Sequence, residues 1–181
     1  MPSELQFTLT RYPEPVLRRV ATLVEAFDAE LQGTVQAMFE LMYRSQGVGL
    51  AAPQVGLGMR LLVLDPAGDP SESDSQPLVF VNPTLLELSG ELTTFEEGCL
   101  SFPGIYAEVR RPERCRVRAQ GVDGKTFEAE YEGFVSRILQ HEYDHLEGVL
   151  LVDRMSPADK QRHKAALQEL VDRFKSARSV R

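Results

Sequence analysis

Residues 140–148 read QHEYDHLEG, and the HExxH pattern inside them decides how the rest of the chain is interpreted. His141 and His145 lie one helical turn apart on the same face, so their imidazoles can bind one metal ion. Glu142 points the same way and is placed to hold a proton from a water on that metal. The alternative, for this motif alone, is a helix with a structural histidine–glutamate network.

The helix that carries this motif is expected to run over residues 133–148. At 100° per residue, one face holds two apolar side chains and three ionisable ones. The apolar pair identifies this face as the buried one. A buried carboxylate without a partner is costly, so these ionisable groups need a cation or a dense hydrogen-bond network. The residues of the face are Phe134, Ile138, His141, Glu142 and His145.

A tetrahedral metal site needs a third protein ligand and keeps its fourth position for water. Downstream of His145 the candidates are weak, and His163 is expected on the surface of the last helix. Upstream, Cys99 follows a glutamate pair in EEGCLS, and a metal would keep its thiol deprotonated. The alternative for Cys99 is a small buried hydrophobic residue, which is also the expectation for Cys115 in its alternating strand.

Composition narrows the class of protein. The 181 residues suit one domain over 1–181. No apolar run approaches the roughly 20 residues of a membrane-spanning helix, and the N-terminus lacks a secretory pattern. Two cysteines are a poor basis for a disulfide framework, which favours a reducing cytoplasm. The net charge of −7 argues against bulk attraction to nucleic acid, and no specific nucleic-acid readout is expected.

The first half of the chain predicts one helix and two strands. Five apolar residues of the helix share one face, and the helix should end near Gly47. Residues 47–56 hold too many small side chains for a good strand and are expected to be irregular. Strands are expected at 60–64 and 78–81, joined by a surface loop over 66–77. The apolar helix residues are Leu31, Val35, Met38, Phe39 and Met42.

The second half predicts a hairpin and a final basic helix. Strands at 114–119 and 126–131 flank an Asp-Gly turn. The last helix should start with Ser156 as N-cap and occupy residues 156–181, with seven basic and three acidic residues. Strands before helices indicate an α+β fold. The buried stripe of the last helix is expected to be Leu167, Leu170, Val171 and Phe174.

Three segments together resemble the peptide deformylase family. They read GVGLAAPQVG at 47–56, EEGCLSFPG at 96–104 and QHEYDHLEG at 140–148. Their order and separation match the family, and the similarity extends from residues 11–17 to about Pro157. The resemblance implies a small α+β domain in which antiparallel or mixed β-sheets wrap around the HExxH helix, followed by a C-terminal helix.

The resemblance also implies roles for single residues. Glu142 would be the general base and acid, while the side chain of Gln54 and the backbone N–H of Leu100 would stabilise the oxyanion. The reaction would remove the formyl group from nascent chains that begin with N-formylmethionine and release formate. One divalent metal ion is implied, ferrous iron in cells, with zinc, nickel or cobalt as substitutes. Its implied ligands are Cys99, His141 and His145.

Position in the motifs implies a pocket for the methionine side chain, although ordinary core packing is the alternative for each residue alone. Gly47 and Gly49 would let the backbone run beside an extended peptide. Arg111 is expected to meet the peptide or a carboxylate. Tyr106 stands where some members carry arginine, which leaves contacts beyond the methionine open. The implied substrate-binding residues are Val48, Gly49, Phe95, Phe134 and Ile138.

Two rival functions stay open at this point. One is an HExxH metallopeptidase, which would need a wider cleft and a downstream ligand. The other is a structural zinc module in which a fourth ligand closes the metal shell. The protein is expected to be a monomer. Its basic last helix is expected to dock on the ribosome, with a solvated helix face as the equal alternative.

Overall fold

The computed structural model describes residues 6–179, which form an α+β fold. One antiparallel sheet contains five strands in sequence order: β1 (Gly49–Ala51), β2 (Leu61–Leu64), β3 (Leu78–Cys99), β4 (Phe102–Gln120) and β5 (Thr126–Glu132). Residues 6–179 also form five helices: α1 (Ala29–Arg44), α2 (Gly133–Leu146), α3 (Leu151–Arg154), α4 (Pro157–Arg162) and α5 (Lys164–Ser179). Two 3-10 turns, η1 (Pro15–Arg18) and η2 (Ala52–Val55), complete the fold.

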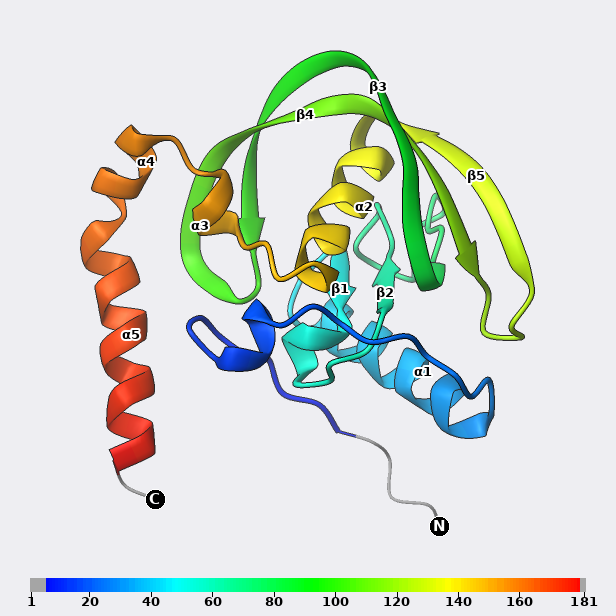
Figure 1. Cartoon of the computed structure of the whole chain (residues 1–181), viewed down its shortest axis with the longest axis horizontal. Helices are drawn as coiled ribbons and strands as arrows, with labels where there is room; N and C mark the ends of the chain where they lie inside the picture. Colours follow the sequence, from blue (N-terminus) through cyan, green and yellow to red (C-terminus); the bar gives the residue numbers. More distant parts are fainter. Residues whose placement is uncertain (1–5, 180–181) are drawn as a thin grey trace.

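Strands β3 and β4 form a long arch that bends over α2 (Figure 1). Register shifts along the pair allow this bend, since a bulge bends and twists the strand that contains it. The arch confirms that strands wrap around the HExxH helix. The strand predicted at 78–81 is the start of β3, and its continuation through Pro83 and Gly90 was not predicted, because both residues normally interrupt strands.

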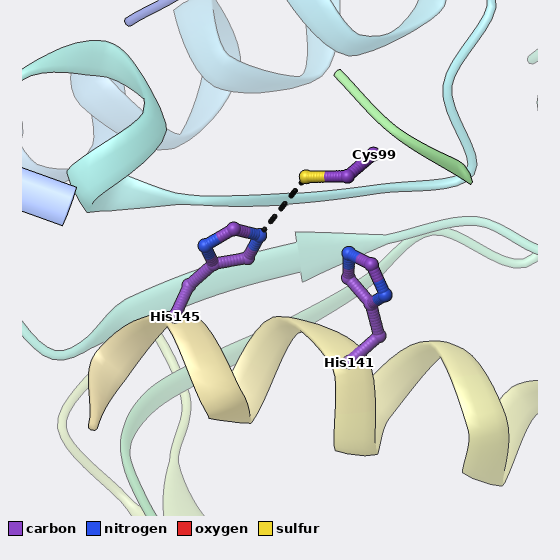
Figure 2. A group of neighbouring side chains, drawn as sticks. All are labelled: Cys99, His141 and His145. Carbon is purple, nitrogen blue, oxygen red and sulfur yellow. Dashed lines mark hydrogen bonds between the residues drawn. The ribbon is translucent and has the colours of Figure 1, made fainter. Parts of the chain in front are cut away.

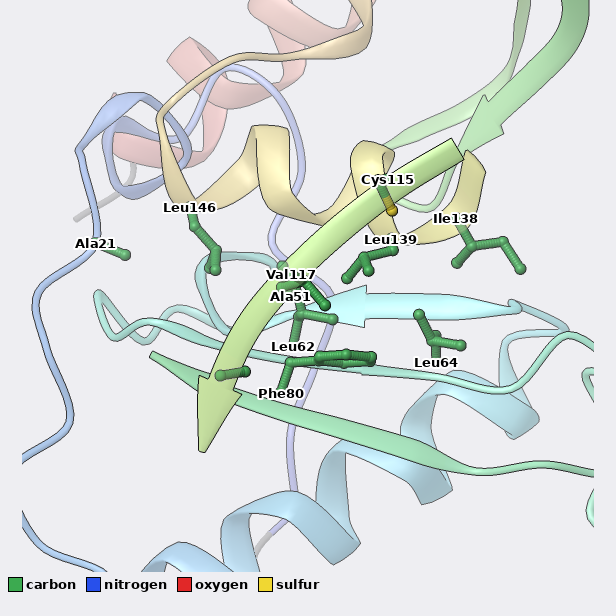
Figure 3. Packing of buried hydrophobic residues seen from close by; sticks show 11 residues of the cluster. Ala21, Ala51, Leu62, Leu64, Phe80, Cys115, Val117, Ile138, Leu139 and Leu146 are labelled. Atoms are coloured by element: carbon green, nitrogen blue, oxygen red, sulfur yellow. The ribbon is translucent and has the colours of Figure 1, made fainter. Parts of the chain in front are cut away.

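Helix α2 lies at the centre of the fold and is buried on most of its surface. Figure 3 shows Ile138, Leu139 and Leu146 of α2 packed toward the strands. Phe80 in β3 contributes the largest side chain of this cluster and is completely buried. Cys115 is 1% exposed there, which confirms the expected core packing. The helix therefore has a fixed position from which polar side chains can project.

Helix α1 covers the other side of the β1–β2 region and has its own core. Asp28 caps its start by accepting hydrogen bonds from two backbone N–H groups. The predicted apolar face is confirmed, with Phe39 partly buried and the other four residues buried. The helix ends at Arg44, near Gly47 as predicted. Its C-cap is Ser45 and the left-handed residue after it is Gln46 (φ 57°), so the prediction of Gly47 as the C-cap was wrong by two positions.

The C-terminal segment differs from the single predicted helix. Ser156 does cap α4, since its Oγ accepts from the Asp159 N–H at 3.1 Å. The helix is interrupted at His163, after which α5 runs along one side of the molecule (Figure 1). In the predicted stripe, Leu170 is buried and the other three residues are partly buried. The position predicted for Arg181 lies outside the described residues.

The connecting segments largely agree with the predictions made from the sequence. Residues 66–77 form turns between β2 and β3, and residues 121–125 close the β4–β5 hairpin with two backbone hydrogen bonds. The segment 47–56 is more ordered than expected, because residues 49–51 pair with β2. Small side chains are needed there because α2 packs directly against this strand. No helix among residues 6–179 is long and apolar enough to cross a membrane.

Candidate active site

Two histidines of α2 and a cysteine of the arch converge on one point (Figure 2). His141 and His145 project from the same face of the helix, and Cys99 lies at the end of β3. Sγ of Cys99 is 3.4 Å from Nε2 of His145. One donor atom from each residue lies within 4.8 Å of the others. The structure therefore brings together all three residues predicted as metal ligands.

Cys99 is positioned by the tight connection between β3 and β4. The pairing register shifts between Gly98 and Cys99, and the ladder closes at Phe102. A Cβ on Gly98 would lie 2.7 Å from the ring of Tyr106, so only glycine lets this ring lie against the strand. In the turn, Oγ of Ser101 donates to the carbonyl of Thr10 at 2.8 Å. These contacts fix the backbone that presents the thiol.

Gln54 reaches the same site from η2 and is 1% exposed. Its Oε1 accepts a hydrogen bond from the N–H of Ala51 at 2.9 Å, which orients the amide. Its Nε2 then lies 3.3 Å from Oγ of Ser101 and 3.6 Å from Sγ of Cys99. A side-chain donor is thus held beside the thiol. Leu100, the second residue predicted to donate, follows Cys99 and lines the adjacent cleft.

Glu142 is buried next to the histidines, with 5% of its surface exposed. Its Oε2 has no hydrogen-bond partner among the described residues. Burial, together with the charge of Glu97, raises the pKa of Glu142 to about 7. Gly49 lies against this carboxylate, because an added Cβ there would be 2.6 Å from Oε1. The site therefore holds a carboxyl group that is suited to exchange a proton.

A buried ionic network supports His141, and this network was not predicted from the sequence. Glu97, 6% exposed, accepts from Nδ1 of His141 at 2.9 Å, Nε of Arg111 at 2.7 Å and Nη1 of Arg137 at 2.8 Å. Burial alone would raise the pKa of Glu97, but the hydrogen bonds from His141 and Arg111 lower it to about 2. Glu97 is therefore ionised, Nδ1 of His141 donates to it, and Nε2 remains for the site.

The two histidines have opposite pKa shifts. Burial by itself lowers the pKa of His141, but its hydrogen bonds to Cys99 and Glu97 raise it well above the ordinary value. Burial and the charge of His141 hold the pKa of His145 well below the ordinary value. His145 is therefore a neutral imidazole, which is the form that coordinates metals. Its buried Nδ1 has no hydrogen-bond partner within residues 6–179.

Arg111 was expected to meet either the peptide or a carboxylate. It binds buried carboxylates and lies outside the cleft, so the second expectation is the one the structure supports. It is 4% exposed, and its Nη1 donates to Oδ2 of Asp144 at 3.0 Å. Arg154 binds the same carboxylate from α3.

His163 differs from the surface residue that was expected. It is partly buried, and its Nε2 is 2.7 Å from the carbonyl of Tyr106.

A cleft of about 490 Å³ opens beside His141 and Glu142. Phe95 and Phe134 stand at its rim, 49% and 44% exposed, with ring centroids 5.9 Å apart. Phe134 is therefore not part of a buried helix face, as the helical pattern had suggested, because it borders open space. All five residues predicted to bind substrate line this cleft: Val48, Gly49, Phe95, Phe134 and Ile138.

The donor set fits one divalent transition metal. A thiol and two imidazoles suit zinc, iron and similar ions. The outer nitrogen of His141 is held by a carboxylate, which is the usual support for a metal-binding histidine. Oε2 of Glu142, which has no hydrogen-bond partner in the described part of the chain, provides a polar group next to the same point. A bound metal ion would therefore explain why Cys99, His141 and His145 converge inside the protein.

Comparisons with known proteins agree with this geometry. Residues 7–161 match the family model described as polypeptide deformylase. Peptide deformylase 1B of Arabidopsis thaliana, named as chloroplastic/mitochondrial, is 47% identical over 153 residues, which are 84% of this chain and 55% of that protein. The peptide deformylase of Chromobacterium violaceum is 48% identical over 161 residues, 89% of this chain and 93% of its own length.

A solved structure shares the whole fold. The crystal structure of a plant peptide deformylase superposes with a TM-score of 0.92 at 42% identity and covers 98% of this chain and 95% of its own. The chain spans less than two thirds of the length of some plant relatives, but nearly all of the bacterial one. The matched residues include the three motifs, both histidines and Cys99. This chain therefore belongs to the polypeptide deformylase family.

Proposed function

We propose that this chain hydrolyses the N-formyl group of peptides that begin with N-formylmethionine and releases formate. The observation that carries the proposal is the convergence of Cys99, His141 and His145 next to Glu142, at a cleft with apolar walls. We assign residues 1–181 to one catalytic domain. A formyl group is the smallest acyl group, so a reaction centre held this closely by buried side chains favours it over larger acyl groups.

Cys99, His141 and His145 would hold the metal ion. When bound, such an ion lowers the pKa of water to about 7 and polarises a carbonyl oxygen. Glu97 fixes the ring of His141 through Nδ1, so Nε2 would be the atom that binds the ion. We propose ferrous iron as the ion in cells and zinc, nickel or cobalt as substitutes. Metal analysis and activity of protein prepared without oxygen, compared with zinc-loaded protein, tests this choice.

Glu142 would take the proton from the attacking water and deliver it to the leaving amine. Its buried Oε2 has no hydrogen-bond partner within residues 6–179, which leaves this oxygen available for that transfer. Gln54 and the N–H of Leu100 would stabilise the negative charge that develops on the formyl oxygen. Gln54 is suited to this role because Ala51 fixes its amide and directs Nε2 toward Cys99.

The cleft walls would bind the first residue of the peptide. Val48, Phe95, Phe134 and Ile138 offer apolar surface of mixed shape, which suits a flexible thioether side chain. Gly49 keeps the backbone of the wall within reach of an extended peptide, which could add to the sheet edge as a strand does. Tyr106 at the cleft margin would contact residues beyond the methionine.

The substrate would come from the ribosome, and we propose that α5 docks there. The helix exposes Lys164, Arg173, Lys175 and Arg178, while Leu167 and Leu170 pack against the body of the protein. Basic side chains attract ribosomal RNA through its phosphates. Sedimentation with ribosomes at low salt should be lost when residues beyond about 160 are removed. Unchanged sedimentation would leave α5 as a solvated helix face.

We propose a monomer in the cytoplasm, in keeping with the free thiols of Cys99 and Cys115. The chloroplastic and mitochondrial names of plant relatives make an organelle the alternative. Fractionation of the source cells with an antibody against the chain distinguishes the compartments, and sedimentation equilibrium gives the oligomeric state.

Substrate panels test the reaction. Iron-loaded protein should release formate from formyl-Met-Ala-Ser and leave acetyl-Met-Ala-Ser intact. Cleavage of internal bonds in unformylated peptides would instead indicate an HExxH metallopeptidase. Bound metal without any hydrolysis would indicate a structural metal site.

A further inference from the structure

Asp65 is a completely buried carboxylate that the proposed reaction does not use. It follows the last residue of β2, and four donors satisfy its two oxygens. Oδ1 accepts from the N–H groups of Ala67 and Gln76, each at 3.1 Å. Oδ2 accepts from the hydroxyl of Tyr43 at 2.8 Å and from that of Ser75 at 2.6 Å. Such a fully bonded buried charge holds its partners in fixed positions.

These partners lie at both ends of one wall of the cleft. The wall segment, residues 45–49, contributes every one of its residues to the cleft lining. Tyr43 belongs to the last turn of α1, two residues before the segment begins. At the other end, the backbone N–H of Asp65 donates to the carbonyl of Val48 at 2.8 Å. One residue therefore holds the wall segment from both sides.

The loop 66–77 supports the same wall from behind. Gly68 has a positive φ of 69°, and a Cβ added there would lie 3.3 Å from Cγ1 of Val48 and 3.6 Å from the carbonyl oxygen of Gly47. The loop therefore touches the outer surface of the wall segment. Asp65 binds both the beginning and the end of this loop through Ala67, Ser75 and Gln76.

The charge states keep this arrangement intact near neutral pH. Burial by itself would raise the pKa of Asp65, but hydrogen bonds from Ser75, Gln76, Tyr43 and Ala67 lower it below the ordinary value. Burial and the hydrogen bond to Asp65 raise the pKa of Tyr43 to about 12. The carboxylate is thus ionised and the phenol protonated, as the hydrogen bonds require.

We propose that Asp65, with Tyr43 and Ser75, is a positioning group that sets the wall segment 45–49 for an extended peptide. It acts through Val48 and Gly49 and touches neither the metal ligands nor the reacting atoms. The proposal rests on the deformylase function for its kinetic consequence. The metal ligands and Glu142 come from α2 and β3, and pairing with Leu64 of β2 holds Gly49 beside Glu142 without help from Tyr43 or Ser75. A wall loosened by loss of either hydroxyl should therefore weaken peptide binding much more than it slows the chemical step.

Single hydroxyl deletions test the proposal in the iron-loaded full chain. Tyr43→Phe and Ser75→Ala should each raise KM for formyl-Met-Ala-Ser about fivefold, the effect of one lost hydrogen bond, with kcat within about twofold. Ser75→Thr keeps a hydroxyl and should restore the KM. Matched controls are Ser73→Ala, at an exposed position of the same loop, and Tyr131→Phe, in the sheet. Both should behave as the wild type.

A general loss of stability would give a different result. The proposal is wrong if kcat of Tyr43→Phe and Ser75→Ala falls while KM stays unchanged. It is also wrong if the KM of these two variants equals that of the controls. Hydrogen exchange provides a readout without substrate: amides in residues 45–49 should exchange faster in Tyr43→Phe than in Tyr131→Phe. Faster exchange in a protein that releases no formate would refute the deformylase function and keep the wall support. Unchanged exchange in an active enzyme would refute the wall support alone.

Discussion

Replacing Arg111 with leucine tests the buried network behind the site. Arg111 donates two hydrogen bonds to Glu97 and one to Asp144, and all three residues are at most 9% exposed. Removing one partner of a buried ion pair costs about 3–5 kcal/mol, because uncompensated charge remains inside the protein. Glu97 keeps Arg137, and Asp144 keeps Arg154, so we expect the lower end, about 3 kcal/mol.

Urea denaturation at a fixed excess of metal measures this loss, and a thermal scan should give a Tm lower by about 6–12 °C for a chain of this size. The matched control is Arg114→Leu, three residues along β4. Arg114 pairs with Glu132 at 3.5 Å, and both side chains are about half exposed or more, so we expect a change below about 1 kcal/mol. Equal losses for the two variants, or a loss below about 1 kcal/mol for Arg111→Leu, would refute the reasoning.

Three further changes have defined outcomes. Gly49→Ala places a Cβ 2.6 Å from Oε1 of Glu142, so kcat/KM should fall at least about tenfold. Its control is Gly58→Ala, whose new Cβ has no atom of the described residues within 4 Å apart from its chain neighbours, and which should match the wild type in formate release. Gln54→Met removes one donor to the oxyanion and should lower kcat about 100-fold with metal content unchanged; a kcat near that of the wild type would exclude the role. The pKa of Asp65 is lowered in the folded protein, so its charge stabilises the fold above the ordinary carboxylate pKa, and this contribution disappears as the pH falls through the folded value. Urea midpoints between about pH 5 and pH 3 should therefore decline more steeply for the wild type than for Asp65→Asn, and parallel declines would contradict the assignment.

The elements with strong local signals could be predicted from the sequence. Periodic apolar residues gave α1, the Asp-Gly pair gave the β4–β5 turn, and Ser156 gave the start of α4. The arch of β3 and β4 had no such signal, because it is stabilised by pairing between distant residues and by its position over α2. The break at His163 coincides with a tertiary contact, the hydrogen bond of its Nε2 with the carbonyl of Tyr106, which local sequence patterns do not indicate.

The site, like the fold, could be predicted from the sequence only in part. The meeting of Cys99 with the two histidines could be predicted from the motifs, because each motif carries a residue type with a specific chemistry. The network around Glu97 could not be derived in this way, since arginines on strands usually face solvent. A glutamate directly before the Gly-Cys pair was the available signal. The five predicted cleft residues do line the cleft, and their contacts with substrate stay a prediction.

The most direct test of the central claim is a paired measurement of metal content and formate release in the wild type and in Glu142→Gln. Both proteins should contain one metal ion per chain, because the ligands Cys99, His141 and His145 are intact in both. In a single turnover with formyl-Met-Ala-Ser, the wild type should release formate, and the variant should be slower by about 100-fold or more. Formate release by Glu142→Gln at the wild-type rate, or by wild-type protein stripped of its metal, would contradict the account.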